Sequence, residues 1–594
     1  NLGTALTTGT DNVAIGEASL DAVTTGSDNT AVGDNAAGAL TTGSDNVAVG
    51  SGALATEDGH GKNVAVGSES LATLNAGADS YNVAVGYQAG NDLTTGVENT
   101  LIGGLAGDVL TDADYNVAVG YTALSADTLG SRSVAIGRAA LQAQNFTTAT
   151  AVYNTAVGFN AGTAVTTGIY NTLIGGLTGD AFTDADYNVA IGTQALSADT
   201  LGSRSVAIGH AVLQSQNFTT ATDAYNTAVG FSAGTAVTTG VQNTFIGGLS
   251  GDANTTASRN VAVGHNAATA NTTGADNVGV GDSALAANTT ASNNTALGSS
   301  ALQANTTGTS NTGIGRAALN ANTTASNNTA VGYYALVANT TGAGNTAVGT
   351  IALDAITTSS NNTAVGHEAL TNATTGAGNT SLGKGSMTGV VTGSNNVAVG
   401  YAAMTANTTA SNNVAVGVNA LDTNTTGASN TAVGQSALDA NTTASFNTAV
   451  GRSALAANTT AANNTAVGYA ALTANTTGDN NVAVGALTLD ANTTGVRNTA
   501  VGQQSMGANT TGDYNVALGR DSLHKNTTAD NNVAIGYAAL YENTTGAGNI
   551  AIGKNSLDAN TTGGTNTGVG HYALSGNTTA GFNTGIGNAA LQAT

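Results

Sequence analysis

Polar and apolar residues alternate over a short stretch that returns along the whole chain. Residues 463–478 read NNTAVGYAALTANTTG, in which Thr465, Ala466 and Val467 precede a Gly. Alternate positions of a β-strand share one face, so we expect Thr465 and Val467 to face the core and Ala466 to face outward. Leu472 is expected to supply a second core contact, and the residues before it fit either a short helical turn or an extended strand.

The Gly that ends this stretch marks a repeat with a nearly constant, seventeen-residue spacing. It occurs 34 times and recurs without a slip from Gly230 to Gly587; the longer steps are those from Gly67 to Gly86, from Gly137 to Gly158 and from Gly209 to Gly230. Such a period indicates a solenoid, in which each coil buries its apolar face on the next, and it is too short for a helical hairpin. We therefore predict an all-β fold, a parallel β-solenoid (β-roll) of about 35 coils, with residues 1–594 as one continuous domain.

The position directly after this Gly is charged or aromatic in many copies, which marks it as exposed to solvent. Its residue types recur every fourth coil, which indicates four-coil modules, and the blocks 86–157 and 158–229 are close copies of one such module with a four-residue insertion. A cation beside a Tyr is a candidate stripe for glycan contacts or lateral packing, although inheritance by duplication is the simpler explanation. The stripe comprises Arg316, Tyr333, Lys384, Tyr401, Arg452, Tyr469, Arg520 and Tyr537.

The middle position of the expected strand is small or apolar, and never charged, in all 34 copies. A solvated strand face would normally carry long polar side chains, so we interpret this column as an outward face that another chain covers. Drift of harmless alanines among duplicated repeats is the alternative. The column includes Ala432, Ala449, Ala466 and Ala483.

Two columns of Asn are expected to stack from coil to coil. The column four places before the Gly should start the strand, because Asn tolerates turns and stacked amides hydrogen-bond to one another; it includes Asn430, Asn447, Asn464 and Asn481. The Asn of the NTTG segment shares its column with Leu or Val in earlier coils, so we expect a buried inner ladder in preference to N-glycosylation sites. That ladder includes Asn441, Asn458, Asn475 and Asn492.

Composition narrows the classes of partner. The net charge is −23, charged residues are 8% of the chain, and Cys, Pro and Trp are absent. Nucleic acid and anionic membranes are disfavoured as partners, because both need clustered Lys and Arg. No apolar run is long enough to insert into a bilayer, and the absence of Cys excludes disulfides and thiolate metal sites.

No catalytic or cofactor-binding motif stands out, so we expect neither enzymatic activity nor a cofactor. The six His residues form no group in the sequence. Acidic residues near the turns are candidates for weak Ca²⁺ binding, although such residues more often cap turns. They include Asp11, Asp28, Asp45 and Asp276.

The motif Asn-Thr/Val-Ala-Val/Ile-Gly, as in NTAVG at residues 464–468 and NVAVG at residues 46–50, resembles the head repeats of YadA-like trimeric autotransporter adhesins. Similar arrays that include NTTG occur in phage tail fibres. The resemblance covers essentially the whole chain. It implies a left-handed parallel β-roll with three chains packed around an axis, and it would make Ala466 and its equivalents the face between chains.

These observations favour a structural role. We expect an extracellular fibre or shaft of a cell-surface adhesin or a virion tail fibre, a homotrimer that mediates projection and attachment to a host-surface glycan or receptor. The alternative is a ligand-binding solenoid for glycan or ice, although adjacent Thr476 and Thr477 should point opposite ways, leaving at most one outward file of Thr. Neither end contains an evident cap, so we also expect the chain to be an internal segment of a longer one.

Overall fold

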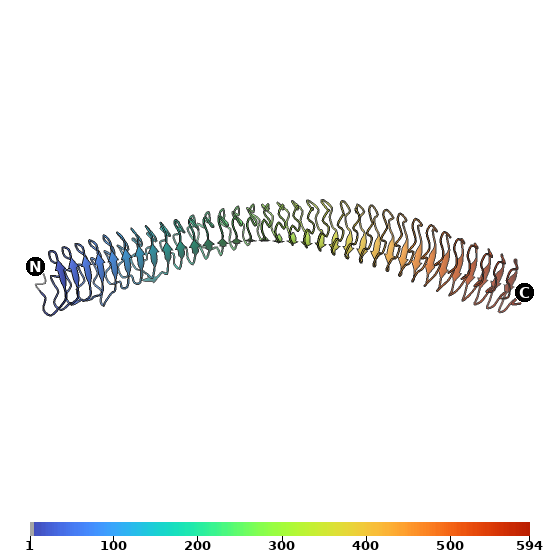
Figure 1. Ribbon diagram of the computed structural model, residues 1–594, viewed down its shortest axis with the longest axis horizontal. Helices are drawn as coiled ribbons and strands as arrows, with labels where there is room; N and C mark the ends of the chain where they lie inside the picture. Colours follow the sequence, from blue (N-terminus) through green and yellow to red (C-terminus); the bar gives the residue numbers. More distant parts are fainter. Residues whose placement is uncertain (1–4, 594) are drawn as a thin grey trace. The chain divides into compact units, whose positions relative to one another are not determined.

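The computed structural model describes residues 5–593, and the chain divides into two compact units, Asn1–Ser300 and Ala301–Thr594. Within the described residues every regular element is a short β-strand, and none is a helix. In each unit the three-residue strands form one row along one side of the coils, one strand to a coil, and turns complete the rest of each coil (Figure 1).

The strands of this row have the same position in every repeat. In the first unit they are β1 (Val13–Ile15), β2 (Thr30–Val32), β3 (Val47–Val49), β4 (Val64–Val66), β5 (Val83–Val85), β6 (Thr100–Ile102), β7 (Val117–Val119), β9 (Val134–Ile136), β11 (Thr155–Val157), β12 (Thr172–Ile174), β13 (Val189–Ile191), β15 (Val206–Ile208), β17 (Thr227–Val229), β18 (Thr244–Ile246), β19 (Val261–Val263), β20 (Val278–Val280) and β21 (Thr295–Leu297).

The second unit continues the same pattern. Its strands are β22 (Thr312–Ile314), β23 (Thr329–Val331), β24 (Thr346–Val348), β25 (Thr363–Val365), β26 (Thr380–Leu382), β27 (Val397–Val399), β28 (Val414–Val416), β29 (Thr431–Val433), β30 (Thr448–Val450), β31 (Thr465–Val467), β32 (Val482–Val484), β33 (Thr499–Val501), β34 (Val516–Leu518), β35 (Val533–Ile535), β36 (Ile550–Ile552), β37 (Thr567–Val569) and β38 (Thr584–Ile586).

Neighbouring coils pair in parallel and in register. Between β30 and β31, for example, Ala449 lies opposite Ala466 and Val450 lies opposite Val467. Each position of the repeat therefore becomes a physical column of the stack. The all-β parallel solenoid with a seventeen-residue repeat, predicted from the sequence, is confirmed.

At two of the longer steps, those after Gly137 and Gly209, neighbouring coils are joined by an additional pair of short strands. Strand β8 (Gly130–Ser131) pairs in parallel with β10 (Thr150–Ala151), and β14 (Gly202–Ser203) pairs in the same way with β16 (Thr222–Asp223). The two arrangements are equivalent, as duplication of the module requires. The insertion thus lengthens the coil without disturbing the main row of strands.

The strand faces are the reverse of those expected from the sequence. The column of Ala432, Ala449, Ala466 and Ala483 lies inside the coil with 0% exposure, whereas the flanking Thr465 and Val467 are half-exposed. The reason is the narrow interior. Gly279 occupies this column in its coil, and a Cβ added there would lie 3.3 Å from the Ala284 carbonyl oxygen and 3.5 Å from Leu285 Cδ1. The column is small because the coil's own Leu turn approaches it, so these alanines are not an outward face covered by another chain.

Three coils carry a large residue at this inward position, and each is compensated locally. Leu101 stands where most coils have Ala, and the Leu of the turn is replaced by Gly90 in the preceding coil and by Gly107 in its own. A Cβ on Gly90 would lie 2.7 Å from Leu101 Cδ1. The same exchange occurs at Leu173 and at Phe245. The interior therefore keeps its volume, as a close-packed core requires.

The turn after the strand is neither helical nor extended. Ala470 and Leu472 both have left-handed backbones, with φ of 52° and 50°. This conformation costs about 1–2 kcal/mol for a residue that carries a Cβ. The Leu side chain is fully buried, so its burial offsets that cost by about 1.5–3 kcal/mol.

The Gly at the end of each strand is required by both conformation and space. Gly468 has φ of 141°, and a Cβ added to it would lie 2.3 Å from the carbonyl oxygen of Gly485 in the next coil. No side chain fits this gap without separating the two coils.

We predict that Gly468→Ala destabilises its coil by about 2 kcal/mol or more, because it combines a disfavoured φ with a clash against backbone. The measurement is hydrogen exchange of the amides in residues 448–501, together with the urea midpoint. Gly77→Ala is the matched control, since a Cβ at Gly77 meets nothing within 4 Å. Equal exchange in the two variants would contradict this account of the repeat.

Candidate functional site

The first Asn column ties each coil to the next through side chain and backbone. The Asn447 amide N–H donates to Asn430 Oδ1 at 2.9 Å, and Asn430 Nδ2 donates to the Ala444 carbonyl at 2.8 Å. All four residues singled out in this column, Asn430, Asn447, Asn464 and Asn481, are buried. The Oδ1 of each of these four residues therefore accepts from a backbone N–H of the next coil, which would otherwise be buried without a partner, whereas Asn464 Nδ2 is buried without a partner.

The Asn of the NTTG segment forms a ladder of side chains inside the coil. Asn458 Nδ2 donates to Asn441 Oδ1 at 3.0 Å and to the Ala461 carbonyl at 3.0 Å. Asn475 and Asn492 repeat the arrangement. These side chains are fully buried, so a glycan cannot be attached to them in the folded chain.

Where the first column lacks Asn, the second column supplies the missing group. Ser133 is too short to reach the next coil, and Gln144 takes over: its Nε2 donates to Ser133 Oγ at 2.9 Å while its Oε1 accepts from Asn154 Nδ2 at 2.9 Å. The same substitution recurs in the duplicated module at Ser205, Gln216 and Asn226. In both modules a Ser in the first column is thus accompanied by a Gln in the inner column, Ser133 with Gln144 and Ser205 with Gln216. The sequence analysis did not predict this pairing.

Three coils carry a carboxylate in the inner column in place of Asn. Asp127 Oδ2 accepts from Gln144 Nε2 at 2.6 Å, and its Oδ1 accepts from the backbone N–H groups of Gly130 and Phe146. Asp199 has the equivalent contacts, and burial raises the pKa of its carboxyl. Carboxylates bonded in this way act as structural acceptors, each closing the polar network of one coil.

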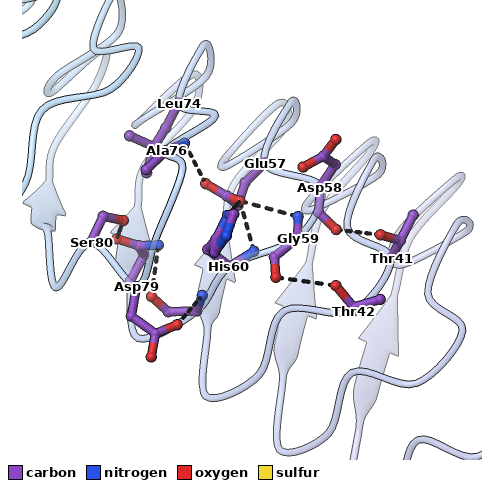
Figure 2. A network of polar contacts seen from close by, with 12 residues as sticks. Thr41, Thr42, Glu57, Asp58, Gly59, His60, Leu74, Ala76, Asp79 and Ser80 are labelled. Atoms are coloured by element: carbon purple, nitrogen blue, oxygen red, sulfur yellow. Dashed lines mark hydrogen bonds and ion pairs between the residues drawn. The ribbon is translucent and has the colours of Figure 1, made fainter.

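Glu57 is the third such carboxylate, and it lies in a loop with other potential metal ligands (Figure 2). In the described part of the chain, Glu57, Asp58 and His60 each offer one ligand atom, all within 4.8 Å of one another. The fully buried Glu57 carboxylate already accepts from the backbone N–H groups of Gly59, His60 and Ala76. Its contacts match the structural role of Asp127, so we assign it to the coil's own turn.

The outward face of the strand row is uniform and uncharged. It consists of two columns, Thr, Val or Ile at the first strand position and Val, Ile or Leu at the third, in all 34 coils. Every one of these side chains is half-exposed or exposed. Ile246, for example, is 40% exposed and Leu297 is 47% exposed. A face of this regularity without any charge is unusual for a solvated surface.

Two further columns flank this face, one at each end of the strand. The column after the Gly contains the predicted stripe, and there the Arg316 guanidinium lies 5.9 Å from the Tyr333 ring centre. In the described residues no such contact joins the other three pairs, Lys384 with Tyr401, Arg452 with Tyr469 and Arg520 with Tyr537. The stripe is thus exposed, but only its first pair is in cation–π contact.

The column five places before the Gly carries an aromatic file that sequence reasoning missed. Tyr153, Tyr170 and Tyr187 stack with ring centres 5.4 and 5.0 Å apart. Arg132 lies over Tyr153 at 5.7 Å, and Arg204 lies over Tyr187 at 5.1 Å. The signal was present in the sequence, because these residues occupy one repeat position in consecutive coils.

Within residues 5–593, the acidic residues proposed from the sequence as Ca²⁺ ligands do not form a group of three close ligand atoms. Asp11, Asp28 and Asp45 follow one another in the column five places before the Gly. Asp276 occupies the same column in a later coil, where it pairs with Arg259 at 2.6 Å, and that guanidinium lowers the pKa of its carboxyl.

Comparison with known proteins adds no assignment: no model of a known protein family matches the chain, and no curated protein matches it significantly. Residues 5–593 include no helix with the length and apolar character needed to cross a membrane.

The inner ladder yields a prediction with a built-in control. Asn475→Leu should destabilise the stack by about 1–3 kcal/mol, because Asn458 Oδ1 and Asn492 Nδ2 lose their partners. Asn254→Leu should be neutral or stabilising, because both polar atoms of Asn254 are already buried without a partner. Urea midpoints of the two variants test this. A larger loss of stability in Asn254→Leu than in Asn475→Leu would contradict a stabilising role of the ladder.

A second prediction concerns pH. Asp108, Asp180 and Asp354 each have a buried Oδ1 without a partner, and burial raises the pKa of each carboxyl above its ordinary value of 3.8. The folded state therefore holds these protons more tightly than the unfolded chain, so this contribution to stability is complete below pH 3.8 and is lost as pH rises through the folded-state pKa.

We expect the triple variant D108N/D180N/D354N to be more stable than the parent chain at pH 7, and this difference to close near pH 3. The measurement is the urea midpoint at both pH values, with the exposed Asp34→Asn as control. A difference that stays constant between pH 3 and pH 7 would contradict the proposed ionisation.

Proposed function

We propose that this chain is a structural protein, the shaft of an extracellular fibre of the kind that a cell-surface adhesin or a virion tail fibre projects. Its copies associate side by side along the uncharged outward strand face, and three parallel copies are the arrangement that the resemblance to trimeric adhesins favours. The function is projection and attachment, without enzymatic activity.

The observation that carries this proposal is the outward face itself. Its two columns hold only Thr, Val, Ile or Leu in 34 successive coils, although they lie at the surface of a single chain. Burying such apolar area is favourable by about 25 cal/mol for each Å². A partner that covers the face over many coils must itself repeat with the spacing of the coils, and a second copy of this chain has that spacing by construction.

The interior supports the same conclusion. The buried Asn, Gln and carboxylate side chains described above bond to neighbouring coils, so their polar groups serve the stack. Length is therefore added coil by coil, and each coil needs only its neighbours. A protein built in this way suits an extended support, with surface columns free to vary for attachment to a host glycan or receptor.

A ligand-binding solenoid remains the second candidate, and one observation favours it. The first Thr of NTTG is tied to the backbone, as Thr476 Oγ1 donates to the Thr493 carbonyl at 3.0 Å, whereas the second, Thr477, is exposed. The exposed Thr recurs in every coil from Thr239 to Thr579. A regular file of hydroxyl groups suits ordered water or a glycan; thermal hysteresis and glycan-array binding by the purified chain test this function.

For the structural function, we predict that V433K/V450K/V467K prevents association while the fold survives, because a charged column cannot be buried without partners. Sedimentation velocity and circular dichroism measure the two effects. T443K/T460K/T477K, on the exposed Thr file, is the control that should leave the oligomer unchanged.

Substitutions in the inward Ala column should unfold the chain, whereas those in the outward Val column should only prevent association. A432K/A449K/A466K should unfold its coils, because these side chains are fully buried within one chain. A parent chain that sediments as a monomer, or a Val variant that associates normally, would overturn the proposed assembly.

A further inference from the structure

We propose that the Tyr and Arg columns flanking the strand row in the first unit fix the axial register in which copies of this chain associate. The partner is a second copy of the chain, and the proposal rests on the side-by-side association proposed above. The two columns are the ones five places before and one place after the Gly.

The apolar face cannot set a register by its own composition. Its columns are nearly identical in every coil, so sliding one copy by one coil replaces each Val or Thr by an equivalent residue. Pairing is weakly specified wherever the pattern is uniform, and repetitive interfaces need a distinctive residue to choose one alignment. Any register signal must therefore come from columns that differ from coil to coil.

The two flanking columns differ in this way, and in many coils of the first unit they change together. An aromatic residue before the strand is matched by one after it, or a cation before the strand by a cation or His after it. Lys62, Tyr170 and Tyr187 are exceptions, since Ser68, Gly176 and Thr193 follow their strands. The two members of a pair occupy different columns, so copying whole coils does not by itself make them alike. The matched pairs are Tyr81 with Tyr87, Tyr115 with Tyr121, Arg132 with Arg138, Tyr153 with Phe159, Arg204 with His210, Tyr225 with Phe231, and Arg259 with His265.

The residues before the strand contact one another and remain accessible. Tyr170 stacks between Tyr153 and Tyr187, and the cations of Arg132 and Arg204 cover the ends of this stack. Tyr153, Tyr170 and Tyr187 are still 43–47% exposed. Pre-organised Tyr and Arg side chains are the residues that contribute most to protein interfaces.

Their backbone conformation also points to a role outside the coil. Tyr153, Tyr170 and Tyr187 have φ between 54° and 58°, a left-handed region that favours Asn, Asp and Gly over bulky residues. In the second unit the same column is mostly Asn or Gly, as at Asn327 and Gly344. Residues in such sparsely populated conformations cluster at functional sites, and these Tyr side chains, unlike that of the buried Leu472, lie at the surface.

When copies lie side by side, the flanking column of one copy meets a flanking column of its neighbour. Each alignment then brings a different set of aromatic and charged residues together. A slip by one coil changes these contacts along residues 81–231, whereas the contacts of the apolar columns are unaffected.

The test uses cysteines introduced into a chain that has none. A tagged chain with Val49→Cys is co-expressed with a differently tagged chain that carries Val32→Cys, Val49→Cys or Val66→Cys, and each pair is treated with a short thiol crosslinker. The yield of crosslinked product from one combination should exceed the yield from either of the other two by about tenfold. This ratio measures the preference for one register over its neighbours.

The variant Y153N/Y170N/Y187N should make the three combinations nearly equal, because Asn tolerates the left-handed backbone and removes the stack. F446N/F582N, which removes isolated aromatics from the same column of the second unit, should keep the preference. Equal crosslinking in the parent chain, or an unchanged preference in the Tyr variant, would overturn the register proposal while association stands. Absence of crosslinks in every combination, with a monomer by sedimentation, would overturn both.

Discussion

The hydrogen bond between a buried side chain and its copy one coil away is the interaction on which this structure depends. A buried amide without partners costs about 1–3 kcal/mol, and the narrow interior offers an Asn the adjacent coils and the backbone of its own turn as partners. Asn441 and Asn458 meet because their coils are in register, and Asn430 and Asn447 meet for the same reason. Once this requirement holds, additional residues must be accommodated in the turns, as between Asn63 and Asn82, where the Asn82 N–H still donates to Asn63 Oδ1 although the step is longer.

The exceptions follow from the same requirement. Ser133 is tolerated because Gln144 reaches across to replace the missing amide, and Asp127 is tolerated because Gln144 and two backbone N–H groups satisfy it. The side-chain volume of the interior is also balanced locally, since the large Leu101 is accommodated by glycine in the turns of two coils. Variation in the interior is therefore paired, which explains why changes appear in groups and recur together in the duplicated blocks.

The surface is free of this constraint, and its columns divide by how much they vary. The strand face keeps Thr, Val, Ile and Leu throughout, although no packing within the chain demands it. The flanking columns instead differ from coil to coil and carry most of the exposed aromatic residues of the first unit. A uniform apolar face bordered by distinctive columns is what lateral association with a defined alignment would require, and this contrast underlies both proposals.

The sequence by itself determined the period, the parallel register and the positions of the two Asn columns, because a strict repeat makes each position contact its own copy. It also indicated that adjacent Thr476 and Thr477 differ in environment. Only the tertiary structure decided which strand face is inside. Alternation divides residues into two faces but does not identify the buried one, and the small Ala449 fits both a crowded interior and a covered surface. The left-handed turn at Ala470 and Leu472 brings Leu against the Ala column, and that contact, which no spacing in the sequence reveals, places Val450 and Val467 outside.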